Sequence, residues 1–260
     1  MRVLGLDIGS RSVDAVWLHG GRTVDAAVAD SGFDPQAAAR AFVDRGAHDV
    51  IVATGYGRHG AREAFDCEVV TEIKAYGAGV HSLFPQADSV LDIGGQDTKV
   101  IVLGENGRVI DFEMNDKCAA GTGKFLEVMA RALGFDLQQL AEAALSGGGR
   151  AIQISSMCTV FAESEVTGLV HRGEDRAAIA RGLHDSIAKR TLGSLKRIRA
   201  TGPLVFAGGV AKNAAMVELL RKGFDGEVLV PDEAQTVGAL GAALSYVARC
   251  GARGSSPYRR

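Results

Sequence analysis

The chain has 260 residues, of which 47% are hydrophobic and 23% charged, and its formal net charge is −2. A charge so close to zero gives no electrostatic reason to expect nucleic acid or an anionic membrane as partner. No apolar run approaches the roughly 18 residues of a membrane helix. The opening residues also lack the basic and long apolar regions of a signal peptide. The composition therefore predicts a cytoplasmic α/β protein of one large unit or two modest lobes.

The first third of the chain predicts several strands and two helices. Apolar residues either alternate with polar ones or run continuously in the expected strands, whereas the helices show wider spacing and helix-end residues. Strands are expected over 3–8, 12–19, 22–30 and 49–55, and helices over 34–46 and 72–84.

The opening pattern returns near residue 87. Asp7-Ile8-Gly9 ends the first strand, and Asp92-Ile93-Gly94 ends a later strand that is followed by a second one over 98–103. This repeat predicts two related lobes, 1–86 and 87–247, with the last helix able to pack back on the first lobe. The segment 248–260 is expected to be a flexible tail because it is basic and rich in Gly and Ser.

The second half of the chain predicts helices between strands. In the segment 123–133, five apolar residues at helical spacing predict one buried face, namely Phe125, Val128, Met129, Ala132 and Leu133. Further helices are expected over 137–145, 159–173, 176–199, 214–224 and 235–250, and strands over 203–210 and 227–231. The last helix is rich in small residues, which suits close packing.

Three glycine turns point to a nucleotide. In two of them an aspartate at a strand end precedes the glycines: Asp7 with Gly9 and Ser10, and Asp92 with Gly94 and Gly95. The N–H groups of such turns can hold a phosphate, and the carboxylate can hold Mg²⁺ through water. One Asp-x-Gly is explained by a simple strand turn, but two copies and a third turn at Gly208 and Gly209 predict a nucleotide cleft between the lobes.

Other catalytic patterns are weak in this chain. The Gly-Thr-Gly-Lys stretch at 121–124 is not a phosphate-binding P-loop, because Phe125 follows Lys124 where Ser or Thr is required. Lys124 is expected to be a solvated first-turn lysine. The six histidines are scattered and lack metal-ligand spacing, so each is expected to be a surface or hydrogen-bonded residue.

The four cysteines are widely spaced, so a disulfide framework is not expected in a cytoplasmic chain. Cys67 and Cys250 are expected to be small buried hydrophobic residues. Cys118 and Cys158 precede predicted helices, whose positive ends favour thiolate. They are either two buried thiols or half of the four-thiolate set of an iron–sulfur cluster, completed by a symmetric dimer.

Six motifs, taken together, resemble one family: LGLDIGS, ATGYGR, DIGGQDTKVI, MNDKCAAGTGKFLEVMA, SSMCTVFAESEV and GGVAKN. The family comprises the ATP-dependent activators of 2-hydroxyacyl-CoA dehydratases and the related ATPase subunits of benzoyl-CoA reductase. The resemblance covers roughly residues 1–247. The glycine motifs alone would indicate only the wider superfamily of sugar kinases, actin and Hsp70.

The resemblance implies a two-lobed actin-like fold with duplicated mixed β-sheets flanked by helices. It implies a homodimer with one 4Fe–4S cluster held by Cys118 and Cys158 of both subunits, and ATP or ADP with Mg²⁺. The implied catalytic residues are Asp7, Asp92 and Gln96, the last either orienting the attacking water or simply contacting phosphate. The implied nucleotide contacts are Gly9, Ser10, Arg11, Gly94, Gly95, Gln96, Asp97, Gly121, Gly208, Gly209 and Lys212.

The implied output is a low-potential electron, received from ferredoxin or flavodoxin and passed to a separate dehydratase or benzoyl-CoA reductase component. Related activators carry a histidine where this chain has Tyr76, which puts the subgroup in doubt. A sugar or small-carboxylate kinase remains an alternative, but it leaves Cys118 and Cys158 without a task. A non-catalytic nucleotide sensor is the second alternative.

Overall fold

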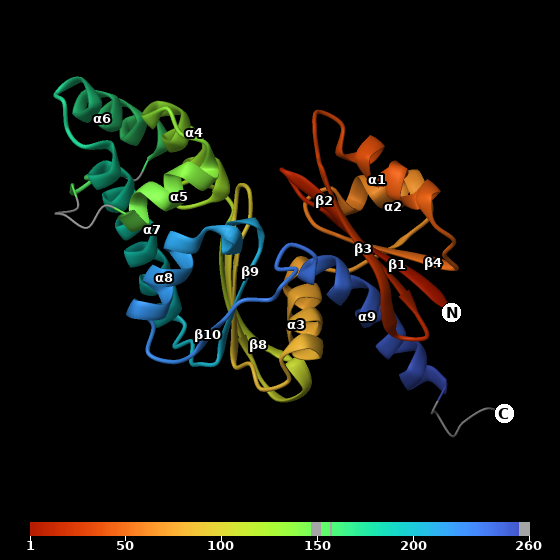
Figure 1. Cartoon of the computed structure of the whole chain (residues 1–260). Helices are drawn as coiled ribbons and strands as arrows, with labels where there is room; N and C mark the ends of the chain where they lie inside the picture. The colour runs from red at the N-terminus through yellow and green to blue at the C-terminus, as the bar shows by residue number, and fades with distance from the viewer. Residues whose placement is uncertain (147–151, 157, 255–260) are drawn as a thin grey trace. The chain divides into compact units, whose positions relative to one another are not determined.

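The computed structural model describes residues 1–146, 152–156 and 158–254 and forms two compact units (Figure 1). The first unit comprises Met1–Ala87, Leu103–Ile110 and the segment from Gln235 onward, and the second comprises Asp88–Val102 and Asp111–Ala234. The division into lobes 1–86 and 87–247 stays a prediction. No helix in the described part of the chain is both long and apolar enough to span a membrane.

The sheet of the first unit has the strand order β3-β2-β1-β4-β5. Strand β1 runs antiparallel to β2 and parallel to β4. The strands are β1 (Arg2–Ile8), β2 (Ser12–His19), β3 (Arg22–Asp30), β4 (Val50–Thr54) and β5 (Glu68–Val69). Residues on both faces of β1 and β2 are buried, as expected for a sheet covered by helices on two sides.

Helices cover both faces of this sheet. One face packs against α1 (Pro35–Arg45) and α2 (Arg58–Phe65). The other packs against α3 (Glu72–Leu83) and α9 (Val237–Gly254). The small residues of α9 allow the predicted close packing, since a Cβ at Gly241 of α9 would lie 1.7 Å from the Ala75 carbonyl oxygen of α3.

One expectation for this unit is wrong, and one helix was not predicted. Helix α9 continues to Gly254, past the point at 248 where the flexible tail was expected to begin, and residues 255–260 lie outside the described residues. Helix α2 was missed, because its sequence RHGAREAF combines charge with a glycine and shows a single fully buried residue, Ala61.

The sheet of the second unit repeats the strand pattern, in the order β10-β9-β6-β7-β8. Strand β6 runs antiparallel to β7 and parallel to β9, as β1 does to β2 and β4. The strands are β6 (Ser89–Ile93), β7 (Thr98–Leu103), β8 (Val109–Asn115), β9 (Leu204–Ala207) and β10 (Val228–Leu229), with the 3₁₀ turn η1 (Glu105–Gly107) between β7 and β8. The predicted α/β class with duplicated mixed sheets is confirmed.

A single large hydrophobic core joins this sheet to five helices. They are α4 (Gly123–Leu133), α5 (Leu137–Ser146), α6 (Thr159–His171), α7 (Arg176–Arg197) and α8 (Ala214–Gly223), and the 3₁₀ turn η2 (Gly209–Lys212) precedes α8. Figure 1 shows α4 to α8 gathered in this unit.

The buried face of α4 is rotated from the predicted one. Phe125, Met129 and Leu133 are buried as expected, but Leu126 and Ala130 complete the face. Val128 and Ala132 are only partly buried at its border. Both stripes satisfy helical spacing, so the sequence alone could not choose between them.

Candidate functional site

Asp7 stands at the end of β1 among buried groups. The residue is 7% exposed, and its register partner across the β1–β2 pair is Asp14, which is 5% exposed. Two glycines crowd its carboxylate: a Cβ at Gly55 would lie 2.4 Å from Oδ1, and one at Gly238 would lie 2.0 Å from Oδ2. Only glycine backbone can approach so closely, so the carboxylate is held firmly at the strand end.

Asp92 occupies the same position in the second unit, but its neighbour differs. Its register partner is Lys99, which is 2% exposed and donates to Asp92 Oδ2 at 2.9 Å and to Asp97 Oδ2 at 2.7 Å. Burial raises the pKa of Asp97, and the nearby Asp92 acts in the same direction, against the opposing effect of Lys99. Sequence analysis missed Lys99, because a lysine in the strand TKVIVL gives no sign of its burial.

The internal repeat extends further than the sequence indicated. Gly208 follows β9 with φ +83°, and a Cβ there would lie 2.2 Å from Asp92 Oδ1. Gly55 follows β4 with φ +86° and stands in the same relation to Asp7. Each unit therefore pairs a strand-end aspartate with a left-handed glycine from the neighbouring parallel strand. Among the described residues, Asp92 Oδ1 is buried without a hydrogen-bond partner.

The first amide of each glycine turn closes a hairpin. Gly9 N–H donates to the Ser12 carbonyl at 2.9 Å, and Gly94 N–H donates to the Asp97 carbonyl at 3.0 Å. These two amides are therefore already hydrogen-bonded within the protein, and the phosphate contacts of the two loops stay a prediction. The remaining loop residues include Ser10, which is partly buried, and Gln96, which is exposed.

The carbonyls of the second glycine turn meet the start of α4. Gly123 N–H donates to Gly94 O at 2.9 Å and Lys124 N–H to Gly95 O at 2.8 Å. The first amides of α4 are thus taken by protein carbonyls rather than directed at a phosphate. The side chain of Lys124 is 43% exposed and lies 3.6 Å from Glu127, so the prediction of a solvated first-turn lysine is confirmed.

The other predicted contacts lie in turns of the second unit. Gly121 is buried next to Ile187 of α7 and has φ +84°, a backbone conformation that favours glycine. Lys212 is exposed at the end of η2, one residue before Asn213, the N-cap of α8.

The two candidate cluster cysteines are both exposed, so the alternative of two buried thiols is wrong. Cys158 is the N-cap of α6, as expected. Cys118 lies in the loop before α4, whose N-cap is Thr122, so it precedes that helix as expected. The turn between them is closed by Thr122, whose N–H and Oγ1 both donate to the Ala119 carbonyl, at 3.0 and 2.7 Å.

The other two cysteines differ in burial. Cys67 is buried in the core of the first unit, and burial raises the pKa of its thiol, which confirms the prediction. Cys250 is only partly buried on α9, so the same prediction fails there. Within the described ranges, no group of three or more His, Cys, Asp or Glu side chains is arranged to hold a metal ion.

Glu165 fixes the segment that leads to Cys158. Its two carboxylate oxygens accept from Ser155 N–H and Ser156 N–H, both at 2.9 Å. Burial acts to raise the pKa of Glu165, but the two amide hydrogen bonds outweigh it and the pKa is lowered. Beside Cys158, Val160 and Phe161 on the first turn of α6 are each 67% exposed, which leaves an apolar surface next to the thiol.

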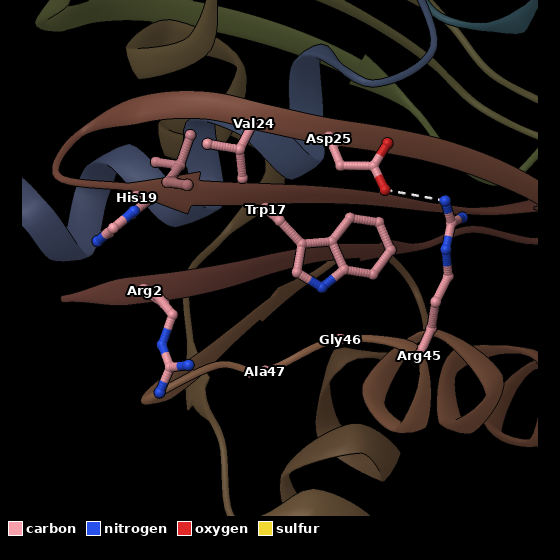
Figure 2. Close-up of a pocket in the computed structure, with 9 residues that line it drawn as sticks. Arg2, Trp17, His19, Val24, Asp25, Arg45, Gly46 and Ala47 are labelled. Atoms are coloured by element: carbon pink, nitrogen blue, oxygen red, sulfur yellow. Dashed lines mark hydrogen bonds and ion pairs between the residues drawn. The ribbon is translucent and has the colours of Figure 1, made fainter.

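A separate hollow of about 380 Å³ lies at one end of the first sheet (Figure 2). Trp17 and Arg45 line it, and Arg45 pairs with Asp25 at 2.8 Å. The indole Nε1 has no hydrogen-bond partner among the described residues. None of the predicted nucleotide or cluster residues lines this hollow.

Comparison with known proteins supports the motif-based resemblance. The model of the BadF/BadG/BcrA/BcrD ATPase family matches residues 4–245. The activator of lactoyl-CoA dehydratase from Anaerotignum propionicum is 44% identical over 253 residues, covering 94% of this chain and 96% of the relative. A benzoyl-CoA reductase subunit from Thauera aromatica is 31% identical over 203 residues, covering 75% of this chain and 70% of the relative.

A solved structure agrees with the fold over the full length. The activator of the 2-hydroxyisocaproyl-CoA dehydratase from Clostridium difficile, solved with bound ADPNP, has a TM-score of 0.88 and 36% identity, and the match covers 100% of both chains. This similarity confirms the predicted two-lobed actin-like fold class.

Proposed function

This chain belongs to the BadF/BadG/BcrA/BcrD ATPase family, and from that premise we propose that it is an ATPase that activates a 2-hydroxyacyl-CoA dehydratase by electron transfer. The observation that carries this proposal is the pair of exposed thiols, Cys118 and Cys158, on the unit that also holds the glycine turns at Gly94 and Gly208. A nucleotide-binding domain that serves only phosphate transfer has no use for such thiols.

The two aspartate loops have different chemical surroundings, which suit different roles toward Mg²⁺ and phosphate. Asp7 and Asp14 place two buried carboxylates on neighbouring strands, a favourable environment for a divalent cation. Lys99 bridges Asp92 and Asp97, so Asp92 is already paired and is less available to a metal ion. Asp92 is thus proposed as a structural anchor for Gly208 rather than a metal ligand.

The remaining nucleotide contacts are proposed from the same loops. Ser10 and Arg11 follow Asp7, and the exposed Gln96 can orient a water molecule or contact phosphate. On the second unit, Gly95 and Asp97 adjoin Gln96, and Gly209 and the exposed Lys212 extend the turn at Gly208. Gly9, Gly94 and Gly121 shape their turns and allow close approach of a ligand.

Cys118 and Cys158 fit the donor chemistry of a 4Fe–4S cluster. Such clusters take four thiolates, and one chain offers two exposed thiols, so a second copy would supply the other pair. The start of α6 at Cys158 favours thiolate, because the positive end of a helix stabilises negative charge. When bound, the cluster would supply one-electron chemistry.

The coupling of ATP to electron transfer would follow from differential binding. If ATP binds one arrangement of the glycine turns more tightly than another, it shifts the protein toward that arrangement. The segments that carry Cys118 and Cys158 would move with those turns. The electron would come from ferredoxin or flavodoxin and pass to the dehydratase component.

Anaerobic purification tests this proposal. We expect a brown homodimer with about four irons per dimer, and a Cys118→Ser variant that loses iron while keeping ADPNP binding. Cys250→Ser is the matched control, because Cys250 is a partly buried thiol of the other unit and should leave the iron content unchanged. Colourless, monomeric wild-type protein prepared without oxygen would contradict the proposal.

The relatives also suggest a second candidate function, the ATPase subunit of a benzoyl-CoA reductase, since a subunit of one such reductase is 31% identical to this chain. The higher identity, 44%, to a dehydratase activator favours the first. Reconstitution with each purified partner component separates the two. A sugar or carboxylate kinase would instead show phosphate transfer to a hydroxyl or carboxylate acceptor.

A further inference from the structure

Helix α7 carries a buried histidine whose hydrogen bonds are fully determined. His184 is 0% exposed; its Nδ1 lies 2.8 Å from the Ala180 carbonyl oxygen and its Nε2 lies 3.0 Å from Asn213 Nδ2. Because a carbonyl only accepts, Nδ1 carries the proton and Nε2 accepts from the amide of Asn213. The imidazole is therefore neutral, and its hydrogen bond at Nε2 depends on the orientation of the Asn213 amide.

Asn213 ends the third glycine turn. Its N–H donates to the Val210 carbonyl at 2.9 Å, which closes η2. Its Oδ1 accepts from Met216 N–H at 3.0 Å, which caps α8. The hydrogen bond to His184 thus fixes the end of the segment 208–213, and α7 packs against α8 (Figure 1).

The same stretch of α7 touches the segment that leads to Cys158. A Cβ at Gly182 would lie 1.8 Å from the Ile152 carbonyl oxygen, so helix and segment meet backbone to backbone. Ile152 N–H donates to Ala178 O at 3.2 Å, and Ser186 Oγ donates to Ile154 O at 3.4 Å. Residues 152–156 therefore lie along α7, and Glu165 holds their far end next to Cys158.

We infer that α7 links the segment 208–213 to the segment 152–156, with His184 as a positioning residue that transmits nucleotide binding toward Cys158. His184 and Gly182 are two residues apart on one rigid helix, so a displacement of Asn213 moves both contacts together. The Gly182 contact contains no flexible side chain that could absorb the movement. Close-packed interiors transmit such small shifts.

The inference rests on the proposed binding of ATP to the segment 208–213, and the two can fail separately. Hydrogen–deuterium exchange of the full-length protein, purified without oxygen, is measured with and without ADPNP and Mg²⁺. The readout is the exchange of Ile152, Ser155 and Ser156, whose amides are hydrogen-bonded in the structure. We expect ADPNP to change their exchange rates by about threefold or more, together with those of 208–213.

Variants of α7 separate coupling from simple stabilisation. His184→Leu should keep ADPNP binding and protection of 208–213 but lose the response of 152–156. His184→Gln should restore the response, because the amide oxygen of Gln can accept from Asn213. Gly182→Ala should raise exchange in 152–156 without nucleotide. Gly193→Ala is its matched control on α7, since the nearest atom to the added Cβ is Arg197 Nη1 at 3.9 Å.

Each outcome has a defined meaning. If ADPNP leaves 208–213 unchanged in the wild type, the proposed nucleotide site fails and the inference fails with it. If 208–213 becomes protected but 152–156 does not respond, the nucleotide site stands and the link through α7 is refuted. A full response in His184→Leu refutes the role of His184. If that variant does not fold, the wild-type exchange at Ile152, Ser155 and Ser156 decides.

Discussion

Replacing Lys99 by Met tests whether the second glycine turn depends on a buried ion pair. Lys99 lies between Asp92 and Asp97, at 2.9 and 2.7 Å, and both its side chain and that of Asp92 are 2% exposed. Methionine has a similar length and keeps the packing, but it removes the only positive charge in this group of three residues. Two carboxylates then face each other with no cation between them.

The cost of this change follows from burial. Removing one partner of a buried ion pair typically costs about 3–5 kcal/mol, because a charge is left without compensation. Asp97 is 27% exposed and can recover some hydration, whereas Asp92 cannot. We therefore expect Lys99→Met to lower the free energy of unfolding by about 3 kcal/mol or more near neutral pH, a large share of a typical domain's stability.

The loss should depend on pH. Burial and the nearby Asp92 raise the pKa of Asp97 in the folded state above its unfolded value of 3.8, and the substitution removes Lys99, which opposes this rise. A raised folded pKa gives stability that is present at low pH and lost as the pH rises through it. The destabilisation of Lys99→Met should therefore be largest near pH 8 and shrink toward pH 5.

Urea unfolding followed by circular dichroism at the two pH values measures both effects. Lys124→Met is the matched control, because Lys124 is a 43% exposed lysine with an acid at 3.6 Å on the same unit. It should cost about 0.5 kcal/mol or less. A Lys99→Met variant as stable as this control, or with a deficit that does not change with pH, would refute the reasoning.

The remaining predictions concern the turns and the Cys158 segment. Gly208→Ala should lower the free energy of unfolding by about 3 kcal/mol or more, and Gly173→Ala by only about 1 kcal/mol. Both glycines have positive φ, but only Gly208 lies against Asp92. Thermal unfolding compares the two variants, and equal losses would contradict the Asp92 contact. Glu165→Gln should weaken the hydrogen bonds from the Ser155 and Ser156 amides, because the charged acceptor is lost. In iron-free protein, iodoacetamide should then label Cys158 severalfold faster and leave the labelling rate of Cys118 unchanged, as measured by peptide mass spectrometry. Burial lowers the pKa of His184 below its ordinary 6.5, so stability should fall as the pH drops from 6.5 through the lower folded pKa; His184→Gln should lack this component in unfolding curves taken at a series of pH values.

Local patterns predicted most of the framework because they depend on neighbouring residues only. The alternation over 12–19 and 22–30 and the spacing over 123–133 gave the bounds of β2, β3 and α4 as they occur. Helix α2 could not be found this way, since its glycine and charged residues oppose helix prediction and its stability comes from packing against the sheet.

The aspartate and glycine motifs of the candidate site could be recognised in the sequence, but their contacts could not. The sequence identified Asp7 and Asp92 as equivalent, yet their register partners lie on other strands, and only pairing reveals that one is Asp14 and the other Lys99. Gly55 was overlooked for the same reason, because its role depends on the approach of β4 to β1.

The two units differ at the residue paired with the strand-end aspartate, which is Asp14 for Asp7 and Lys99 for Asp92. Strand order, strand direction and the aspartate–glycine contact are the same in both units, so the scaffold alone does not distinguish their loops. A carboxylate at position 14 adds negative charge beside Asp7, whereas a lysine at position 99 cancels the charge of Asp92. The two loops therefore share a backbone pattern but differ in their register partners, because strand pairing places an acid beside Asp7 and a base beside Asp92.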